Sequence, residues 1–453
     1  MPKQLKSRQM SAQQKKIGFY TAASIVVANM IGTGIFTSLG FQAAEIPSIF
    51  PLLMLWIVGG VIALCGALTY GELGAALPRS GGEYHLLSRI YHPSLGFLSG
   101  WASVTVGFAA PSALAAIALA TYLKTVIPGV PIQHFAATVV IVFTIIHSIS
   151  IRFGSYSHNF FTALKVLLIL VFLFAVSTVE NVEQIDFLPK TGDLGLITSP
   201  GFAVSLIYVS FAYAGWNGAI YVVGEIEKPR RNLPKSLFLG TLLVLILYVL
   251  LNYVFLYTVP LADLSGKIQV GFLSGTKIFG ATGGKLMSGV ISILLISTVS
   301  GHVFVGPRIT QVMGEDYHAL RVLGVKRKNG VPVNAFIFQL IITLILIYSS
   351  TFEQIMVYAG FTLNLITTLT VAGIFVLRKN EPDLPRPYKT WGYPVIPALF
   401  LLMSFWTLTF VMIDKPVESL IGLGVVLFGL LVYFISEHIS KRTKIINHYR
   451  QND

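Results

Sequence analysis

The sequence contains few cysteines and few charged residues. Its single cysteine, Cys65, lies inside an apolar run, which excludes intrachain disulfides and a metal site built from several thiolates. Only 11% of the 453 residues are charged, against about 25% in an average soluble protein, and the mean hydropathy is +0.75. We therefore expect an integral membrane protein that crosses the bilayer several times.

The chain also lacks the motifs of many enzymes and of nucleic-acid-binding proteins. It has no Gly-x-x-x-x-Gly-Lys phosphate loop, no cluster of metal-ligating residues and no Gly-x-Ser-x-Gly nucleophile turn. Its net charge of +13 comes from residues spread over many short segments, with no basic stripe interleaved with aromatic residues. We therefore expect no catalysis, no ATP drive, no cofactor, no metal and no nucleic-acid partner.

Long apolar runs are abundant. Twelve of them are long enough for a helix to cross a bilayer. They cover residues 17–42, 51–77, 96–123, 131–151, 158–179, 200–224, 237–259, 286–307, 333–350, 355–377, 395–413 and 417–437. The sequence therefore predicts an all-α membrane protein with 12 transmembrane helices in contact with the lipid bilayer.

The distribution of Lys and Arg predicts the orientation of these helices. Most of the 32 Lys and Arg residues lie in the tail 1–16, in every second connection and in the tail 438–453. The lysines of the other connections are Lys124, Lys190, Lys267, Lys277, Lys285 and Lys415. Because positively charged short loops stay in the cytoplasm, we expect both tails to be cytoplasmic and the protein to lie in the cytoplasmic (plasma) membrane.

The first span has polar and small residues at its centre: Asn29, Gly32, Thr33 and Gly34. Glycine gives up helical hydrogen bonds at low cost, so this helix is expected to open there. The freed backbone groups cannot face lipid and must line a cavity or bind a ligand. Close packing of two helices through small residues explains the same pattern equally well.

A matching interruption lies in the sixth span, where 211–218 reads Phe-Ala-Tyr-Ala-Gly-Trp-Asn-Gly. Two broken helices five spans apart predict an inverted repeat of five plus five helices. The first repeat would cover 17–180 and the second 200–378, followed by two spans over 395–437. The opened segments would offer amides to an anion and carbonyls to a cation. A small molecule that carries both a carboxylate and an ammonium group fits this description, as an amino acid does.

Ionisable residues within spans are functional hypotheses by default, and Lys165 and His302 are the two considered as functional groups. Lys165 lies about seven residues inside the fifth span, and we expect it to face the bundle and donate to opened carbonyls of the first span; the alternative is a lysine that reaches the cytoplasmic interface. His302 could titrate near neutral pH and couple transport to protons, or be a hydrogen-bonded bundle histidine. No acidic residue lies near the middle of a span, which disfavours a cationic substrate side chain.

Four motifs in this order resemble the amino acid-polyamine-organocation (APC) superfamily, and within it the L-amino acid transporter (LAT) family. They are Ile-Gly-Thr-Gly-Ile-Phe at 31–36, the segment 70–84 with Pro-Arg-Ser-Gly-Gly-Glu-Tyr at its end, Phe-Ala-Tyr-Ala-Gly-Trp-Asn at 211–217, and the segment 225–234. The resemblance covers about 17–437 and implies a LeuT-type fold, with substrate at broken spans 1 and 6.

The resemblance also implies roles for individual residues. The substrate carboxylate would bind the amides and hydroxyl around Thr33 and Gly34. Its ammonium would bind the carbonyls of Val27, Ala28, Ile31, Phe211, Ala212 and Ala214. Phe211 would close over the substrate as a thin gate, and Gly215 would leave room for the substrate side chain.

Lys165 matches a lysine whose ammonium takes the place of a sodium ion in sodium-driven relatives, which implies sodium-independent transport. Two positions depart from the family pattern. Ala28 stands where Gly is frequent, and Ser300 stands where relatives commonly have Asn. Both departures would change the size and polarity of the pocket for the substrate side chain.

The sequence thus predicts an alternating-access carrier, an exchanger, of small to medium neutral L-amino acids. Proton-coupled uptake of amino acids or polyamines, with His302 as the proton site, is the other transport hypothesis. An amino acid sensor that does not transport, or a channel, are alternatives of another class. No cysteine lies in 124–131, between spans 3 and 4, so we expect no disulfide-linked subunit through that loop.

Overall fold

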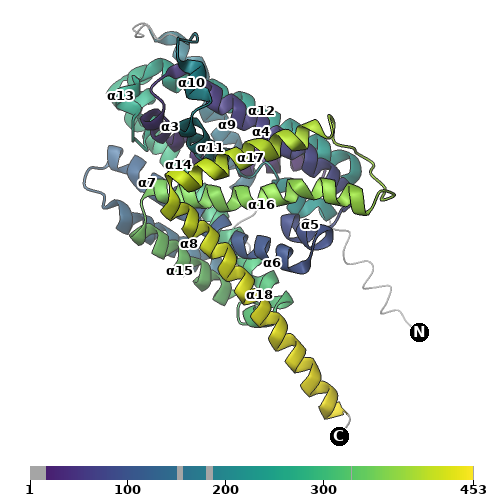
Figure 1. The fold of residues 1–453 in the computed structure, drawn as a ribbon. Helices are drawn as coiled ribbons and strands as arrows, with labels where there is room; N and C mark the ends of the chain where they lie inside the picture. The colour runs from purple at the N-terminus through teal and green to yellow at the C-terminus, as the bar shows by residue number, and fades with distance from the viewer. Residues whose placement is uncertain (1–16, 150–156, 180–186, 328, 452–453) are drawn as a thin grey trace.

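The computed structural model describes residues 17–149, 157–179, 187–327 and 329–451, although not the side chains of 157–159 and 441–451. All regular elements in these ranges are helices (Figure 1). The expected tail 1–16 lies outside the described residues. The helical content agrees with the predicted all-α class.

Eleven helical segments of the described chain are long and apolar enough to cross a membrane. They are built from α2 (Phe19–Met30) with the start of α3 (Gly34–Glu45), α4 (Ile49–Ala76), α6 (Pro93–Ala102) with α7 (Ala109–Val126), α8 (Ile132–Ile149), α9 (Ser157–Ala175), α11 (Pro200–Tyr213) with the 3₁₀ helix η4 (Gly218–Glu225), α12 (Pro229–Thr258), α14 (Val270–Asp316), α16 (Phe352–Asn380), α17 (Val395–Asp414) and α18 (Pro416–Gln451).

The ninth expected span, 333–350, coincides with α15 (Val333–Ser349), a shorter apolar helix of 17 residues. Short helices fill the connections: α5 (Gly82–Ile90), α10 (Asp193–Ile197) and α13 (Leu261–Leu264). Eleven candidate spans and one shorter apolar helix therefore occupy the places of the twelve predicted runs.

Two helices extend furthest beyond their predicted bounds. The eighth run was expected over 286–307, whereas α14 begins at Val270 and contains a kink at Gly280, whose φ of +73° is not helical. The last helix, α18, continues to Gln451 instead of ending at 437. Residues 438–451 contain neither Gly nor Pro, so nothing in this part of the sequence stops the helix.

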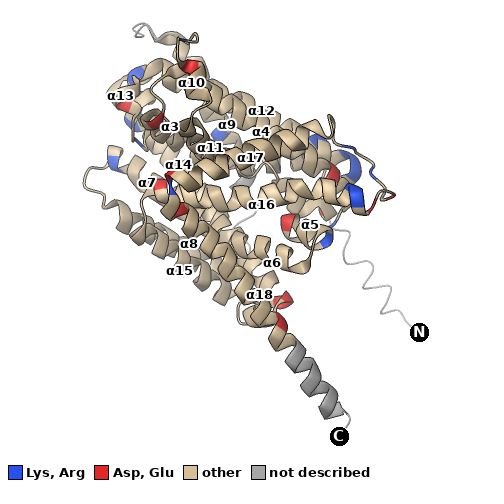
Figure 2. Cartoon of the chain, viewed as in Figure 1, with Lys and Arg blue, Asp and Glu red and all other residues tan. Residues whose placement is uncertain are grey.

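The outer helices carry large apolar side chains on the surface of the bundle. Phe174 on α9, Phe405 on α17 and Phe434 on α18 are 72%, 70% and 56% exposed. The Lys, Arg, Asp and Glu residues lie mostly at helix ends and in connections (Figure 2). An apolar waist between charged ends is the surface expected of a protein that lies in a bilayer.

Buried aromatic residues hold the two interrupted helices in the core. The ring centroids of Trp56 and Tyr248 lie 5.8 Å apart, and those of Tyr213 and Tyr248 lie 5.0 Å apart. Trp56 donates from Nε1 to Gln42 Oε1 at 2.8 Å. Where a polar atom of this cluster donates to a backbone carbonyl, the hydrogen bond holds that part of the helix in place. Such bonds are needed because a buried polar group without a partner costs free energy.

Candidate functional site

The first span is interrupted where the sequence predicts an opening. Helix α2 ends at Met30 and α3 begins at Gly34, and Ile31 between them has an extended conformation with φ −74° and ψ 91°. Three carbonyls at this end of α2 have defined partners: Ile31 N–H donates to Val27 O at 3.0 Å, Tyr248 Oη donates to Met30 O at 2.6 Å, and Lys165 Nζ donates to Ile31 O at 2.8 Å. The break is thus stabilised by side chains of other helices.

The sixth span is interrupted in the same way. Helix α11 ends at Tyr213, and the 3₁₀ helix η4 begins at Gly218 after a short turn. Gly215 in this turn has a φ of +101°, which side chains with a Cβ rarely adopt. The glycine is therefore required by the backbone conformation of the turn.

The two interruptions lie against each other. A Cβ atom added to Gly34 would lie 2.5 Å from Ala212 Cα, and one added to Gly215 would lie 2.6 Å from the Asn29 carbonyl oxygen. Both separations are too short for real atoms, so each glycine permits an approach that any other residue would prevent. Small residues here serve close packing and opening at once, and the two sequence-based explanations of Gly34 are compatible.

The residues just before α2 and just after η4 are also joined to each other. Ile17 N–H donates to Glu225 O at 2.8 Å, and Glu227 N–H donates to Ile17 O at 2.9 Å. These bonds form a parallel bridge between Ile17 and Ile226. The segment that precedes α2 is thereby tied to the segment that follows η4.

Lys165 on α9 is 7% exposed and points into the bundle. Its Nζ donates to Ile31 O at 2.8 Å and to Thr298 Oγ1 at 3.1 Å. The ammonium therefore links the break in the first span to α14. The contact with the Ile31 carbonyl is the one expected from the sequence, and Lys165 does not reach the cytoplasmic interface as the alternative supposed. A role of Lys165 in coupling stays a prediction.

The other predicted substrate-binding residues surround the interruptions, with the exception of Ser300. Those on the two broken spans whose side chains are at most 8% exposed are Val27, Ala28, Ile31, Thr33, Phe211 and Ala212. Ala214 and Gly215 lie in the turn of the sixth span. The hydroxyl of Ser300, by contrast, lies 2.9 Å from His147 Nε2 on α8. His302, which was predicted as a coupling residue, has its Nδ1 2.9 Å from Thr298 O; its role in coupling stays a prediction.

A buried carboxylate near the sixth-span interruption escaped the sequence analysis. Glu83 on α5 is 4% exposed, and its Oε1 accepts from Tyr70 Oη at 2.6 Å and from Asn217 Nδ2 at 3.0 Å. Burial raises the pKa of Glu83 above its ordinary value, although these donors favour the charged form. Glu83 belongs to the quoted segment 70–84, but only the fold shows that it reaches Asn217.

A second buried carboxylate holds together the end of the bundle where α5 lies. Glu72 on α4 is 1% exposed and accepts from Arg378 Nε at 2.9 Å and Nη2 at 2.7 Å. Thr390 N–H donates to Glu72 Oε2 at 2.6 Å, and Arg386 Nε lies 3.5 Å from Oε1. This bidentate pair joins α4 to α16 and to the segment before α17. Sequence spacing gave no sign of these partners, because more than 300 residues separate them.

The apolar helical bundle and its two abutting broken helices define an integral, multi-pass membrane protein with a polar backbone site in its interior, which is typical of transporters. Residues 17–435 match the amino acid permease family. The chain belongs to the amino acid permease family, within the APC superfamily, and is a transporter and not an enzyme.

Two groups of relatives illustrate the similarity. The chain is 31% identical to large neutral amino acids transporter small subunit 2 of Rattus norvegicus, in an alignment that covers 97% of this chain and 84% of the relative. It is also 31% identical to b(0,+)-type amino acid transporter 1 of Mus musculus, over 93% of this chain and 88% of the relative. The human form of the first protein is 30% identical over the same share of this chain.

Proposed function

We propose that the protein is a sodium-independent, alternating-access exchanger of small to medium neutral L-amino acids. Its relatives are named for the transport of large neutral amino acids and for b(0,+)-type amino acid transport. The observation that carries the proposal is the meeting of two interrupted helices, with Gly34 against Ala212 and Gly215 against Asn29. Opened backbone in a membrane interior is tolerated where it is buried in protein or lines a polar cavity, and it offers amides and carbonyls that a zwitterionic substrate can bind.

The proposed fold is of the LeuT type, with 12 spans. One repeat covers 17–180, the inverted repeat covers 200–378, and two further spans cover 395–437. In this arrangement the first amides of α3, at Thr33 and Gly34, bind the substrate carboxylate, because the first N–H groups of a helix have no intrahelical acceptor and carry partial positive charge. The burial of Thr33, which is 4% exposed, supports this position because water is kept away from it.

The substrate ammonium would bind the carbonyls of the two broken helices. The candidates are Val27, Ala28, Ile31, Phe211, Ala212 and Ala214. The carbonyls of Val27 and Ile31 already accept one hydrogen bond each, from Ile31 N–H and from Lys165. A carbonyl oxygen has two lone pairs, so each can accept a second donor. Ser300 would affect this pocket only through its helix, since its hydroxyl contacts His147.

Phe211 would be the thin gate, and Lys165 the group that makes sodium unnecessary. Phe211 is 8% exposed at the last turn of α11, beside the interruption that it would close. Lys165 supplies a positive charge between Ile31 and Thr298, which is where a metal ion would otherwise have to bridge α2 and α14. Substrate exchange would then need no cation from the solution.

In the proposed topology both tails lie in the cytoplasm and the protein lies in the plasma membrane. The segment that joins α7 to α8 would be extracellular, and it contains no cysteine. A subunit joined by a disulfide through this loop is therefore not part of the proposal.

Counterflow into proteoliposomes tests the proposal. A labelled neutral amino acid is offered outside, in sodium-free buffer, to vesicles with and without unlabelled amino acid inside. Uptake that depends on internal amino acid supports obligatory exchange. Uptake into empty vesicles contradicts exchange, and binding without uptake across a panel of amino acids would indicate a sensor.

Proton-coupled transport is the second candidate, and one contact favours it. Thr298 accepts from Lys165 through its hydroxyl and contacts His302 Nδ1 through its carbonyl. Lys165 and His302 thereby contact the same residue, and Lys165 alone of the two reaches the first-span interruption. The test is uptake into empty vesicles with an inward proton gradient, in the wild type and in H302Q; uptake that the gradient does not change excludes this mechanism.

A further inference from the structure

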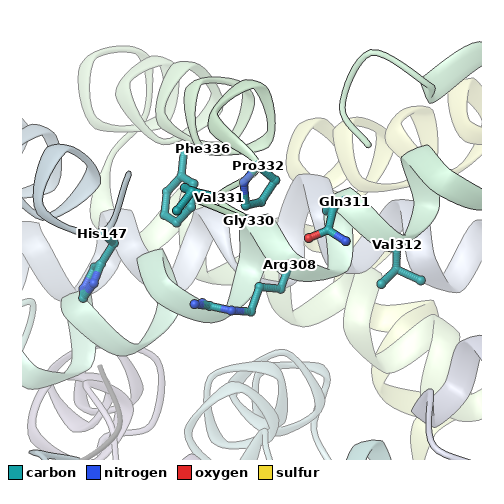
Figure 3. A pocket seen from close by; sticks show the side chains of 8 residues that line it. All are labelled: His147, Arg308, Gln311, Val312, Gly330, Val331, Pro332 and Phe336. Carbon is teal, nitrogen blue, oxygen red and sulfur yellow. The ribbon is translucent and has the colours of Figure 1, made fainter. Parts of the chain in front are cut away.

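A cavity of about 200 Å³ lies away from the two interruptions, where the ends of α8 and α14 meet the start of α15. Figure 3 shows the Arg308 side chain extending toward the side where His147 lies, with Phe336, Val331 and Pro332 along another wall. The loop before α15 is fixed to α8, because Asn329 Nδ2 donates to Ile149 O at 3.3 Å. The cavity therefore has walls from three helices and one anchored loop.

Arg308 brings a positive charge to this cavity without a carboxylate to balance it. Its guanidinium lies over the Phe304 ring, with Cζ 3.4 Å from the centroid, and Nη1 donates to the Phe304 carbonyl. The acidic residues further along α14 are engaged elsewhere: Glu315 pairs with Lys326 at 2.8 Å, and Asp316 accepts from Tyr84 Oη at 2.9 Å. Within the described residues, Arg308 forms no ion pair.

His147 also lines this cavity and has one ring nitrogen without a partner. The side chain is 2% exposed, and Nε2 lies 2.9 Å from Ser300 Oγ. Its Nδ1 is buried and has no hydrogen-bond partner in the described part of the chain. A buried polar atom without a partner costs free energy, and such an atom in a native structure requires an explanation. A ligand in the cavity would provide the partner.

We propose that this cavity binds a phosphate group, with Arg308 as the principal ligand and His147 as the second donor. The planar guanidinium matches the oxygens of a phosphate with two parallel N–H donors. Stacking on Phe304 holds the guanidinium in place and still leaves N–H groups for a ligand. The absence of a carboxylate pair for Arg308 among the described residues means that no protein group competes for that charge.

Two sources could supply the phosphate, and the surroundings favour a phospholipid headgroup. Each helix at the cavity carries exposed apolar residues: Ile149 on α8 is 67% exposed, Val312 on α14 is 46% exposed and Ile337 on α15 is 48% exposed. These side chains would contact the acyl chains of a lipid whose phosphate lies at Arg308. A soluble phosphate ester is the other source, and it would need no such surface.

The site is independent of the proposed transport function, so its test measures binding alone. The wild type, R308Q, R308K and H147F are purified in detergent, and R321Q is the matched control because Arg321 is exposed and does not line the cavity. Native mass spectrometry measures retained phosphatidylglycerol after incubation with it. In parallel, lipid-depleted protein is titrated with inorganic phosphate while the thermal unfolding midpoint is followed.

A lipid headgroup site predicts that the wild type and R321Q retain one phosphatidylglycerol, and that R308Q binds it about tenfold more weakly, since one charge-assisted hydrogen bond is worth about that factor. R308K should lose less than R308Q, because it keeps the charge but not the fork. Saturable stabilisation by inorganic phosphate that R308Q abolishes, without lipid retention, would assign the site to soluble phosphates.

Equal lipid retention and equal phosphate response in R308Q and the wild type would overturn the proposal. If R308Q does not yield folded protein, H147F and R308K decide the matter, because H147F removes the second donor and retains the ring volume. Unchanged binding in both of these variants would equally exclude the site.

Discussion

A buried ammonium without a carboxylate partner is costly, and Lys165 has none among the described residues. The cost is offset only by the Ile31 carbonyl, at 2.8 Å, and the Thr298 hydroxyl, at 3.1 Å. In the proposed alternating-access mechanism, a relative movement of α2 and α14 would have to break at least one of these two bonds. We therefore expect Lys165 to affect movement between conformations more than binding in one of them.

We predict that K165A lowers the exchange rate by about tenfold or more, while the substrate dissociation constant changes much less, because hydrogen bonds from a charged donor contribute about 1.5–3 kcal/mol each. The measurements are exchange rates in proteoliposomes and calorimetric binding in detergent. K124A, at an exposed lysine, is the control. A normal exchange rate in K165A would remove this role.

Gly34 gives the second prediction at the scale of a residue. G34L should abolish substrate binding, because even a Cβ at this position would lie 2.5 Å from Ala212 Cα. G289A is the control, since a Cβ at Gly289 meets nothing within 4 Å. Calorimetric binding and size-exclusion profiles of the two variants are compared; folded G34L with normal affinity would show that the two interruptions need not touch.

The residues that could be predicted from sequence were those whose chemistry conflicts with a lipid-facing helix. Gly34, Gly215 and Lys165 each stand out in an apolar run, so their positions could be inferred without a fold. The partner of Glu83 and the cavity shared by Arg308 and His147 could not be predicted, because Asn217 and His147 reach these places only through the packing of distant helices. The chemical type of a residue can be read from the sequence at that position, whereas its contacts depend on how distant parts of the chain pack.

Among the elements, the short helix α5 contacts the sixth-span interruption directly. It is only nine residues long, and its buried Glu83 connects it to Tyr70 on α4 and Asn217 in the turn after α11. Because burial raises the pKa of Glu83, the folded protein binds the proton of the Glu83 carboxyl group more tightly than the unfolded chain does. The protonated carboxyl is therefore favoured by folding.

The sign of the resulting pH dependence follows from proton linkage. Where the folded state binds more protons, the free energy of unfolding falls as pH rises. The contribution of Glu83 is present below its ordinary pKa of 4.5 and is lost as pH rises through the raised value. E83Q, which cannot ionise, should lack this loss. The unfolding midpoint of the wild type should therefore fall relative to that of E83Q with rising pH, and parallel curves would contradict the prediction.

Helix boundaries were harder to predict than helix existence. The breaks in α2–α3 and after α11 follow from glycines, which weaken a helix wherever they lie. The extension of α18 to Gln451 could not be inferred from hydropathy, because residues after 437 are polar although they are compatible with a helix. Apolarity marks the part of a helix that can lie in lipid and not the point where the helix ends.

At the scale of the whole molecule, the charge distribution predicts one orientation in the membrane, and the single cysteine makes it testable. Cys65 is 4% exposed, so C65A removes the only native thiol. In this background, Q133C places a thiol at the connection of α7 and α8, and R321C places one between α14 and α15; both positions are exposed.

A membrane-impermeant maleimide added to intact cells should label Q133C and not R321C, and permeabilisation should make R321C reactive. The reason is that most Lys and Arg residues lie in the connections on the side of Arg321, and short positive connections remain in the cytoplasm. Labelling of R321C alone in intact cells would show that the protein has the opposite orientation. It would also move the Arg308 cavity to the extracellular leaflet, where the phosphate would be that of an outer-leaflet lipid or of a solute outside the cell.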